Sequence, residues 1–268
     1  MSSGDPDGHT GMTSVRSADG TPIAYSTQGS GPPVVMVHPA GAYRGFGPQE
    51  TLVPVLAGDF TVITYDRRGR GESGDTPPYA VGREVEDLAA VVAGPGGGEA
   101  SVYGFSSGAL VALHAAGAGD LPLSRLAVME PPLGDGSPDP LTAELDGLVA
   151  GGRREEAVLR FHEAIGVPDE VMAAMGPESL AAMAAIAHTL VYDCRLGDAS
   201  TLDTARAVEV PTLVIDSQGS TDDLTGWAAG IAAVLPKGTH VSLDGDWHGV
   251  LDADLATALR DFLLPRAL

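Results

Sequence analysis

Short apolar runs rich in β-branched residues recur along the chain, and each is bounded by Gly, Pro or Asp. Continuous apolar runs of this length are typical of strands that are buried on both faces of a parallel sheet. The six runs predicted as strands are Pro33–Val37, Phe60–Tyr65, Ala100–Phe105, Arg125–Met129, Pro211–Ile215 and Thr239–Leu243. Ahead of them, Thr13–Ser17 and Thr21–Thr27 flank an Asp-Gly turn and predict an N-terminal β-hairpin.

Segments with helical periodicity lie between these strands. They are Gln49–Leu56, Val81–Val92, Ser107–Ala118, Thr225–Leu235 and Leu251–Leu264. An alternation of strands and helices predicts βαβ units and a doubly wound α/β sheet.

The interval from Pro131 to Glu209 breaks this alternation. It contains four helical patterns, at Asp139–Ala150, Arg153–Ile165, Asp169–Met175 and Glu178–Val191. We interpret residues 131–209 as a helical cap over one end of the sheet, inserted into a core formed by residues 12–130 and 210–268. A separate helical domain is the alternative, but the chain returns to a strand immediately after the interval.

The chain of 268 residues carries 36 acidic against 15 basic residues, a formal net charge of −21. A field of this sign repels a phosphate backbone and an anionic membrane surface, so we expect neither nucleic acid nor a membrane as a partner. Arg67, Arg68 and Arg70 form a cluster that could be taken for a phosphate-binding patch. We favour a glycine-rich turn whose arginines pair with nearby carboxylates.

The single cysteine, Cys194, excludes an internal disulfide and a cysteine-based metal cage. No apolar run reaches the length of about 18 residues that indicates a transmembrane helix. Residues 1–11 lack the basic start and apolar stretch of a signal peptide, and they are predicted to be a disordered tail. We therefore expect a cytoplasmic protein, and a homodimer is compatible with the sequence.

A Gly-x-Ser-x-Gly motif, from Gly104 to Gly108, lies where a predicted strand meets a predicted helix. This sharp turn places its serine in strained backbone geometry, and the flanking residues must be small because the strand and helix approach closely. The helix N-terminus then directs free backbone N–H groups at the group that the serine attacks. Ser106 is the predicted nucleophile, and Ser107 is predicted to donate a backbone N–H to an oxyanion hole.

Together with other motifs, this elbow resembles the α/β-hydrolase superfamily over roughly residues 12–265. The other marks are the helical insertion, His38-Pro39-Ala40-Gly41, the segment from Asp66 to Ser73, and Trp247-His248-Gly249. The resemblance implies a mostly parallel eight-stranded sheet with helices on both faces and a helical cap. It also implies that Ala40 donates the second oxyanion N–H, that His38 packs in its loop, and that neither a metal nor an organic cofactor is needed.

A serine hydroxyl needs a nearby imidazole to accept its proton at neutral pH. Of the seven histidines, His248 alone follows the last predicted strand in a short loop before the terminal helix. The resemblance places the base there, so His248 is the predicted base. His188, in the predicted cap, is a second histidine that could face the cleft, although a structural role is the simpler interpretation.

The acid is the point at which the sequence departs from the common pattern of the superfamily. Ser220 stands where an aspartate is expected after the penultimate strand. Asp216 lies four residues before that position, and Asp222 and Asp223 follow it and equally suit the cap of the next helix. Each of these aspartates is an alternative acid.

Glu130 ends the preceding strand, and a carboxylate there would face the same sheet edge as the histidine loop. Some superfamily members, including haloalkane dehalogenases and zearalenone-type lactonases, carry their acid after this strand. The lactonases resemble this chain further in the Ser-Ser-Gly-Ala elbow at Ser106–Ala109. A dehalogenase would need aspartate at the elbow. We therefore predict the triad Ser106–His248–Glu130. The alternative is that Glu130 has only a structural role, as a salt-bridged residue at the end of its strand.

These residues predict a serine hydrolase that cleaves an ester or lactone through an acyl-enzyme on Ser106. The cap is rich in Ala, Leu, Met and Val, which favours a bulky apolar ester or macrolactone as the small-molecule substrate. His188, Tyr192 and Met183 are the predicted substrate-binding residues of the cap. A biosynthetic cyclase or acyltransferase with the same triad, and a non-catalytic small-molecule binding protein, are the alternative functions.

Overall fold

The structure is a computed structural model that describes residues 13–264, so the predicted tail at residues 1–11 lies outside the described residues. Eight strands form one sheet in the order β1-β2-β4-β3-β5-β6-β7-β8. The antiparallel pairs are β1 with β2 and β2 with β4, and every other neighbouring pair is parallel. The strands are β1 (Ser14–Arg16), β2 (Pro22–Gln28), β3 (Pro33–Val37), β4 (Thr61–Tyr65), β5 (Ala100–Phe105), β6 (Leu123–Met129), β7 (Thr212–Ser217) and β8 (Gly238–Leu243).

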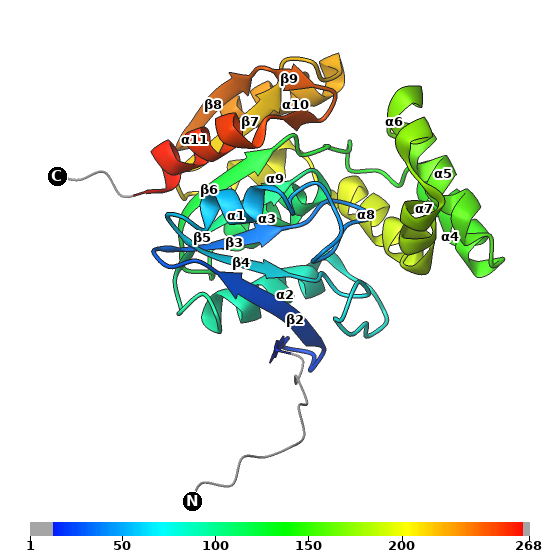
Figure 1. The fold of residues 1–268 in the computed structure, drawn as a ribbon, viewed down its shortest axis with the longest axis horizontal. Coiled ribbons are helices and arrows are strands. Elements are labelled where there is room, and N and C mark those ends of the chain that lie inside the picture. The colour runs from blue at the N-terminus through cyan, green and yellow to red at the C-terminus, as the bar shows by residue number, and fades with distance from the viewer. Residues whose placement is uncertain (1–12, 265–268) are drawn as a thin grey trace, which may run out of the picture.

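Alternate residues of the central strands face opposite sides of the sheet, and helices cover both sides. Val35 of β3 packs in one apolar cluster with α2, α3 and α10, whereas Val34 packs in the other with α1 and α11. These helices are α1 (Leu52–Leu56), α2 (Val81–Ala93), α3 (Ser107–Gly117), α10 (Asp222–Val234) and α11 (Asp252–Leu263). The architecture is the predicted α/β-hydrolase fold, with apolar central strands because both of their faces are buried (Figure 1).

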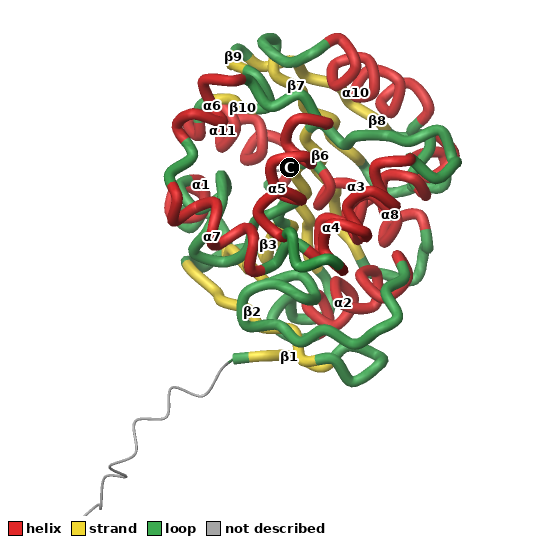
Figure 2. The backbone as a smooth tube through the Cα atoms, turned by 90° about the vertical axis from the view of Figure 1, so that its right-hand side faces the viewer, coloured by secondary structure: helices red, strands yellow, loops and turns green. Residues whose placement is uncertain are grey.

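Between β6 and β7, the chain forms the remaining helices. They are α4 (Pro140–Ala150), α5 (Arg154–Ala164), α6 (Asp169–Ala174), α7 (Pro177–Ala185), α8 (His188–Ala199) and α9 (Leu202–Arg206). In Figure 1 helices α4 to α8 lie beside one end of the sheet, whereas α9 lies among the helices of the core; in Figure 2, viewed from that end, α4, α5 and α7 lie in front of the strands. Leu145, Phe161 and Leu190 belong to an apolar cluster of the insertion's own.

The insertion differs from the sequence prediction at two places. The single helix predicted over Glu178–Val191 is divided into α7 and α8, and Thr189 Oγ1 donates to the Ile186 carbonyl (2.8 Å) at the junction. Such a local side-chain hydrogen bond competes with helix continuation, and the continuous apolar pattern does not reveal it. The short helix α9 was not predicted, and its Ala205 packs in the core cluster against α3.

No helix within residues 13–264 is both long enough and apolar enough to cross a membrane. A two-stranded ribbon, β9 (Gly245–Asp246) with β10 (Gly249–Val250), follows β8 and presents the loop that carries His248.

Candidate active site

Three residues far apart in the sequence meet beyond the carboxyl ends of β5 and β6. Ser106 follows β5, Glu130 follows β6, and His248 lies in the turn between β9 and β10. The Ser106 N–H still donates to the Met129 carbonyl (2.9 Å), and the Glu130 N–H donates to the Ile215 carbonyl (3.0 Å). The hydrogen bonding of the sheet therefore extends up to these two residues and fixes the position of their backbone at the carboxyl edge of the sheet.

The backbone at these three residues is strained. Within residues 13–264, the non-glycine residues with positive φ are Ser106 (53°), Glu130 (45°) and His248 (52°), and there are no others. Such conformations cost on the order of 1–3 kcal/mol each and concentrate at functional sites, where the surrounding structure holds them. The strain singles out the same three residues that the sequence motifs predict as a triad.

Two glycines allow the sharp turn at Ser106. A Cβ on Gly104 would lie 2.6 Å from the Ala109 Cα, and a Cβ on Gly108 would lie 2.3 Å from the Val37 carbonyl oxygen. Both distances are shorter than atoms tolerate, so the close approach of β5, α3 and β3 requires glycine at both positions. This packing explains the Gly-x-Ser-x-Gly spacing physically.

The Glu130 carboxylate binds the imidazole of His248. His248 Nδ1 and Glu130 Oε2 are hydrogen-bonded, and the Ser217 N–H donates to Glu130 Oε1 (2.7 Å). Glu130 is fully buried. Burial acts to raise the pKa of Glu130, but hydrogen bonds from His248, Ser220 and Ser217 outweigh it and lower the pKa below its ordinary value. Glu130 is therefore an ionised carboxylate that fixes the orientation of the imidazole.

Ser220, which stands where the common pattern has an aspartate, supports this pair. The His248 N–H donates to Ser220 Oγ (2.9 Å), and the Ser220 hydroxyl helps to lower the pKa of Glu130. Its hydroxyl thus connects the histidine loop with the carboxylate on the neighbouring strand.

The other candidate acids lie elsewhere. Asp216 pairs with His240 Nε2 of the edge strand β8 (2.5 Å). Asp222 and Asp223 lie in the first turn of α10. Among the hydrogen bonds of the described residues, Glu130 provides the carboxylate that holds His248.

The candidate oxyanion donors lie beside Ser106. Ser107 is the first residue of α3, so its backbone N–H has no partner within the helix. Ala40 lies in the loop after β3, and Ala40, Ser106, Ser107 and His248 all line one cavity. Both N–H groups therefore belong to residues that face the space in front of Ser106.

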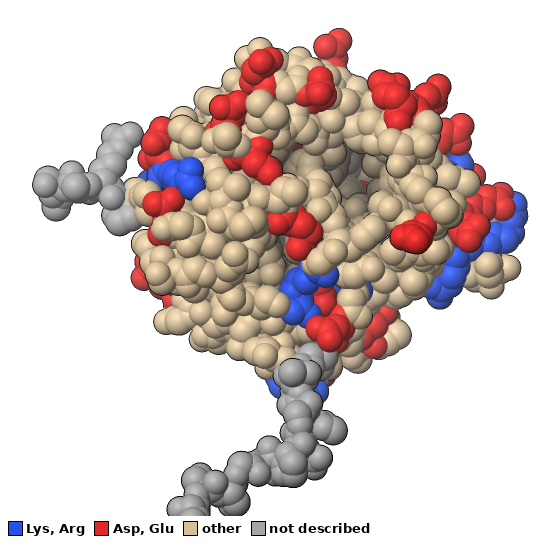
Figure 3. All heavy atoms as spheres, viewed as in Figure 1, with Lys and Arg blue, Asp and Glu red and all other residues tan. Residues whose placement is uncertain are grey.

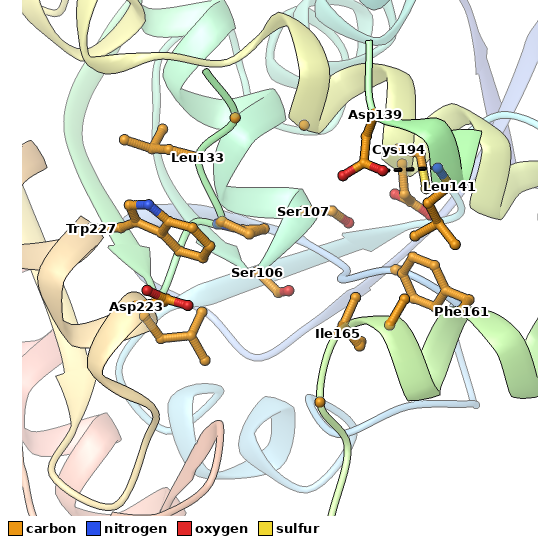
Figure 4. Close-up of a pocket in the computed structure, with 18 of the residues that line it drawn as sticks. Ser106, Ser107, Leu133, Asp139, Leu141, Phe161, Ile165, Cys194, Asp223 and Trp227 are labelled. Carbon is orange, nitrogen blue, oxygen red and sulfur yellow. Dashed lines mark hydrogen bonds between the residues drawn. The ribbon is translucent and has the colours of Figure 1, made fainter. Parts of the chain in front are cut away.

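This cavity of about 410 Å³ lies between the core and the insertion. Figure 4 shows Ser106 at its centre, with Trp227 and Asp223 on one side and residues of the insertion on the other. Its apolar lining comprises Ala40, Pro132, Leu133, Leu141, Phe161, Ala164, Ile165, Leu224, Trp227 and Trp247. Neither Lys nor Arg is among the described residues that line it, whereas Asp139, Asp193, Asp198 and Asp223 are. A hollow between the two parts is also visible on the surface, where acidic side chains predominate (Figure 3).

The predicted substrate-binding residues of the insertion lie outside this lining. Tyr192 OH donates to Asp75 Oδ2 (3.0 Å), and His188 Nε2 lies 3.4 Å from the same oxygen. Met183 lies next to Gly41 rather than on the wall of the cavity. These three side chains are therefore not among the residues that line this cavity, since His188 and Tyr192 contact Asp75 in the loop after β4, and their role in substrate binding stays a prediction.

The cavity wall instead includes residues that the sequence reasoning missed, Phe161 and Ile165 at the end of α5 and Trp227 of α10. The sequence carries no signal for these residues: only the structure shows that Ile165 is a large hydrophobic side chain left exposed at a helix end.

Cys194 also lines the cavity, but burial raises the pKa of its thiol to about 12. The thiolate is the nucleophilic form of cysteine, so this thiol is poorly suited to attack at neutral pH. Within residues 13–264, no group of three or more His, Cys, Asp or Glu side chains is arranged to hold a metal ion.

The arginines of the cluster pair with carboxylates, as predicted, and they are also buried. Arg67, Arg68 and Arg70 are each 1% exposed. Arg67 binds Glu84 through two hydrogen bonds of 2.6 Å, and Arg68 binds Asp87 through two of 2.8 Å. These guanidinium groups are satisfied inside the protein and do not form a surface patch for phosphate.

Comparisons with known proteins agree with this architecture. A family model described as the alpha/beta hydrolase family matches residues 34–258. An alpha/beta hydrolase from Sphaerobacter thermophilus is 44% identical in sequence, over 94% of this chain and 100% of the other, with a TM-score of 0.85.

Two further solved structures share the fold at low identity. An esterase from a Rhodococcus species is 21% identical over 94% of this chain and 98% of its own, with a TM-score of 0.71. An enol-lactonase from Burkholderia xenovorans is 23% identical over 91% of this chain and 97% of its own, with a TM-score of 0.72. The family match over most of the length, together with the 44% identity, shows that the chain belongs to the alpha/beta hydrolase family.

Proposed function

We propose that the protein is a serine hydrolase of carboxylic esters or lactones, in which Ser106 is the nucleophile, His248 the base and Glu130 the acid. The observation that carries this proposal is the buried Glu130–His248 pair beside the strained Ser106 elbow, with Ser106 and His248 opening into one cavity. A positioned imidazole held by a carboxylate is what a serine hydroxyl requires to attack at neutral pH.

The proposed reaction has two halves. Ser106 Oγ attacks the carbonyl carbon while His248 Nε2 takes the hydroxyl proton, and the carbonyl oxygen becomes an oxyanion held by the Ala40 and Ser107 N–H groups. His248 then returns the proton to the leaving alcohol oxygen as the acyl-enzyme forms. Water, deprotonated by His248, attacks the carbonyl carbon of this acyl-enzyme; as the bond to Ser106 Oγ breaks, His248 returns the proton to that oxygen and the acid is released. Each oxyanion donor contributes on the order of 10²–10³ to the rate.

The cavity supports an apolar, uncharged acyl group or lactone ring. Its volume of about 410 Å³ falls within the range of roughly 300–1,000 Å³ that small-molecule sites occupy. Leu133, Phe161 and Trp227 supply apolar walls, and the absence of Lys and Arg among the described lining residues leaves an anionic substrate without a counter-charge. The structural neighbours named as an esterase and an enol-lactonase favour an ester or lactone bond.

The experiment is hydrolysis of a panel of 4-nitrophenyl esters of increasing acyl length and of macrolactones including zearalenone, with Ser106→Ala as the blank. We expect turnover that depends on Ser106 and increases with apolar acyl size. A macrolactone preference would favour the lactonase layout over a general esterase. Turnover equal in Ser106→Ala would contradict the proposed nucleophile.

Labelling with a serine-directed phosphonate separates the alternative functions. Labelling of Ser106 without hydrolysis of any panel member would move the assignment to an acyltransferase or cyclase. Absence of both labelling and hydrolysis would point to a binding protein.

A further inference from the structure

A buried carboxylate from the insertion binds two arginines of the core. Asp193 of α8 is 5% exposed. Its Oδ1 accepts from Arg67 Nη1 (2.9 Å) and Arg70 Nη2 (2.8 Å), and its Oδ2 accepts from Arg70 Nη2 (2.7 Å). Burial acts to raise the pKa of Asp193, but Arg70 and Arg67 outweigh it and lower the pKa, so the group is ionised. The mechanism proposed above does not use this ion cluster.

Arg70 connects Asp193 with one oxyanion donor. Arg70 Nη1 donates to the Pro39 carbonyl (2.6 Å) and to the Ala42 carbonyl (3.3 Å). The Pro39 carbonyl and the Ala40 N–H belong to one peptide group, which is trans. Because a trans peptide is planar, its C=O and N–H point in opposite directions. An arginine that holds the Pro39 carbonyl therefore also sets the direction of the Ala40 N–H.

Arg67 connects the same carboxylate with the other donor. Arg67 Nη1 donates to Ser107 Oγ (3.0 Å) and to the His38 carbonyl (3.3 Å). It thereby joins the residue that starts α3 to the loop after β3. Both candidate oxyanion donors are thus one arginine away from Asp193.

The two arginines depend on Asp193 unequally. Arg67 keeps Glu84 as a second carboxylate partner, whereas among the described hydrogen bonds Arg70 has Asp193 as its carboxylate and backbone carbonyls as its other acceptors. A buried charge that loses its partner is strongly destabilised, and its side chain rearranges toward other acceptors or water. Removal of the Asp193 charge is therefore expected to disturb Arg70 and the Pro39–Ala40 peptide most.

We propose that Asp193 is a positioning residue: from the insertion, and through Arg70 and Arg67, it aims the Ala40 and Ser107 N–H groups at the oxyanion. This inference rests on the proposed serine mechanism. It makes α8 a structural part of the oxyanion hole as well as a cover for the cavity. The hydrogen bond from a charged guanidinium also polarises the Pro39–Ala40 peptide and strengthens its N–H as a donor.

The test compares Asp193→Asn with Asp87→Asn. Asp87 is the control: it is buried and binds a neighbouring arginine, Arg68, through both carboxylate oxygens, but Arg68 has no hydrogen bond to the loop after β3. Asp193 also lines the cavity whereas Asp87 does not, so KM is measured beside kcat to separate positioning from direct contact with the substrate. Both variants lose a buried carboxylate, so both are expected to melt at lower temperature. Only Asp193→Asn is expected to lower catalysis at temperatures where both proteins are folded.

The discriminating measurement is inhibition by a trifluoromethyl ketone. Ser106 Oγ adds to its carbonyl carbon, the hydroxyl proton passes to His248, and the carbonyl oxygen becomes an oxyanion in the hole. For Asp193→Asn we expect kcat to fall roughly 10- to 100-fold, KM to change less than about threefold, and the inhibition constant of the ketone to rise by the same factor as kcat falls. The corresponding secondary alcohol, which cannot form an oxyanion, is expected to bind equally to all variants.

Equal effects of Asp193→Asn and Asp87→Asn on kcat and on ketone inhibition would overturn this inference. So would a loss confined to KM, because that would place Asp193 among substrate-binding groups. If Asp193→Asn does not fold, Arg70→Lys is tested instead. One ammonium group cannot replace the two guanidinium nitrogens that bind the Pro39 carbonyl and Asp193, so the same losses in kcat and in ketone inhibition are expected. If the Ser106→Ala variant turns over substrate as fast as the wild type, the proposed function itself fails. That outcome is distinct from the results for the Asp193 and Arg70 variants.

Discussion

At the scale of single residues, the site depends on which carboxylate reaches the imidazole. Glu130 reaches His248 because the sheet pairing of β6 extends to it and the backbone then turns at positive φ. Asp216, one strand further toward the sheet edge, is already paired with His240. Strand position and backbone conformation, rather than residue type, therefore decide which carboxylate contacts His248.

The acid assignment predicts unequal effects of three alanine substitutions. In Glu130→Ala the His248 imidazole loses the carboxylate that orients it and stabilises its protonated form. The kcat of this variant is therefore expected to fall on the order of 10⁴-fold. Asp216→Ala and Asp223→Ala are expected to stay within about tenfold of wild type, because neither side chain binds His248. Steady-state kinetics on a 4-nitrophenyl ester measure this, and a Glu130→Ala enzyme within a few-fold of wild type would refute the triad.

His38 gives a prediction about stability and pH. Burial, with the nearby Arg70, Arg67 and Arg44, lowers its pKa from the ordinary 6.5 to about 3. The unfolded chain therefore binds a proton that the folded protein does not bind between these pH values, and stability falls as the pH falls through this window.

From pH 7 to pH 5 this single group is expected to cost about 2 kcal/mol of the free energy of unfolding. Urea denaturation at both pH values measures the cost, and the pH dependence should be reduced by that amount in His38→Gln, whatever its absolute stability. An unchanged pH dependence in this variant would show that folding does not lower the pKa of His38.

At the scale of elements, two kinds of glycine show how packing decides the effect of one substitution. Gly108 lies in α3 against the backbone of β3, whereas Gly147 lies inside α4 with nothing within 4 Å of a Cβ. Gly108→Ala is expected to displace the elbow, with a loss of stability of roughly 2 kcal/mol or more and a large loss of activity. Gly147→Ala is expected to stabilise the protein by about 0.5–1 kcal/mol with unchanged kcat.

Thermal and urea denaturation of both variants, alongside ester hydrolysis, check this pair. An active and stable Gly108→Ala protein would contradict the close approach of α3 and β3 on which the geometry of Ser106 depends.

At the scale of the whole molecule, charge and cavity act in the same direction. The net charge is −21, and Asp139, Asp193, Asp198 and Asp223 line the cavity without a lysine or arginine among the described lining residues. Of these four, Asp193 is paired with Arg67 and Arg70. Such a field lowers the local concentration of anions, and salt screens it over a Debye length of about 10 Å at 0.1 M. An anionic ester therefore meets repulsion both on approach and inside the cavity.

We expect kcat/KM for 4-nitrophenyl hexanoate to exceed that for the monoanionic 4-nitrophenyl adipate by about tenfold or more at low salt, and the ratio to shrink at high salt. Asp223→Asn should narrow the ratio, whereas Asp146→Asn, an exposed carboxylate of α4 outside the cavity lining, should change it little. A preference for the adipate ester would contradict this account of the cavity.

The central strands and the turn around Ser106 can be predicted from the amino-acid sequence because both depend on local patterns. The central strands lie within two residues of their predicted bounds, since a strand buried on both faces must be apolar throughout. The turn around Ser106 can be predicted as well, since close backbone contacts require its two glycines. The candidate triad was also proposed from the sequence, but with Asp216, Asp222 and Asp223 left open beside Glu130.

The rest depends on contacts between residues distant in the chain, which no local pattern records. Glu130 meets His248 across 118 positions, and Asp193 meets Arg67 across 126. The division of α7 from α8 turns His188 and Tyr192 to Asp75, and Phe161, Ile165 and Trp227 line the cavity instead. Residue types and spacing thus specify the strands and the candidate nucleophile. Tertiary packing selects the partner of each buried charge and the walls of the cavity, because both require side chains that only the folded chain brings within reach.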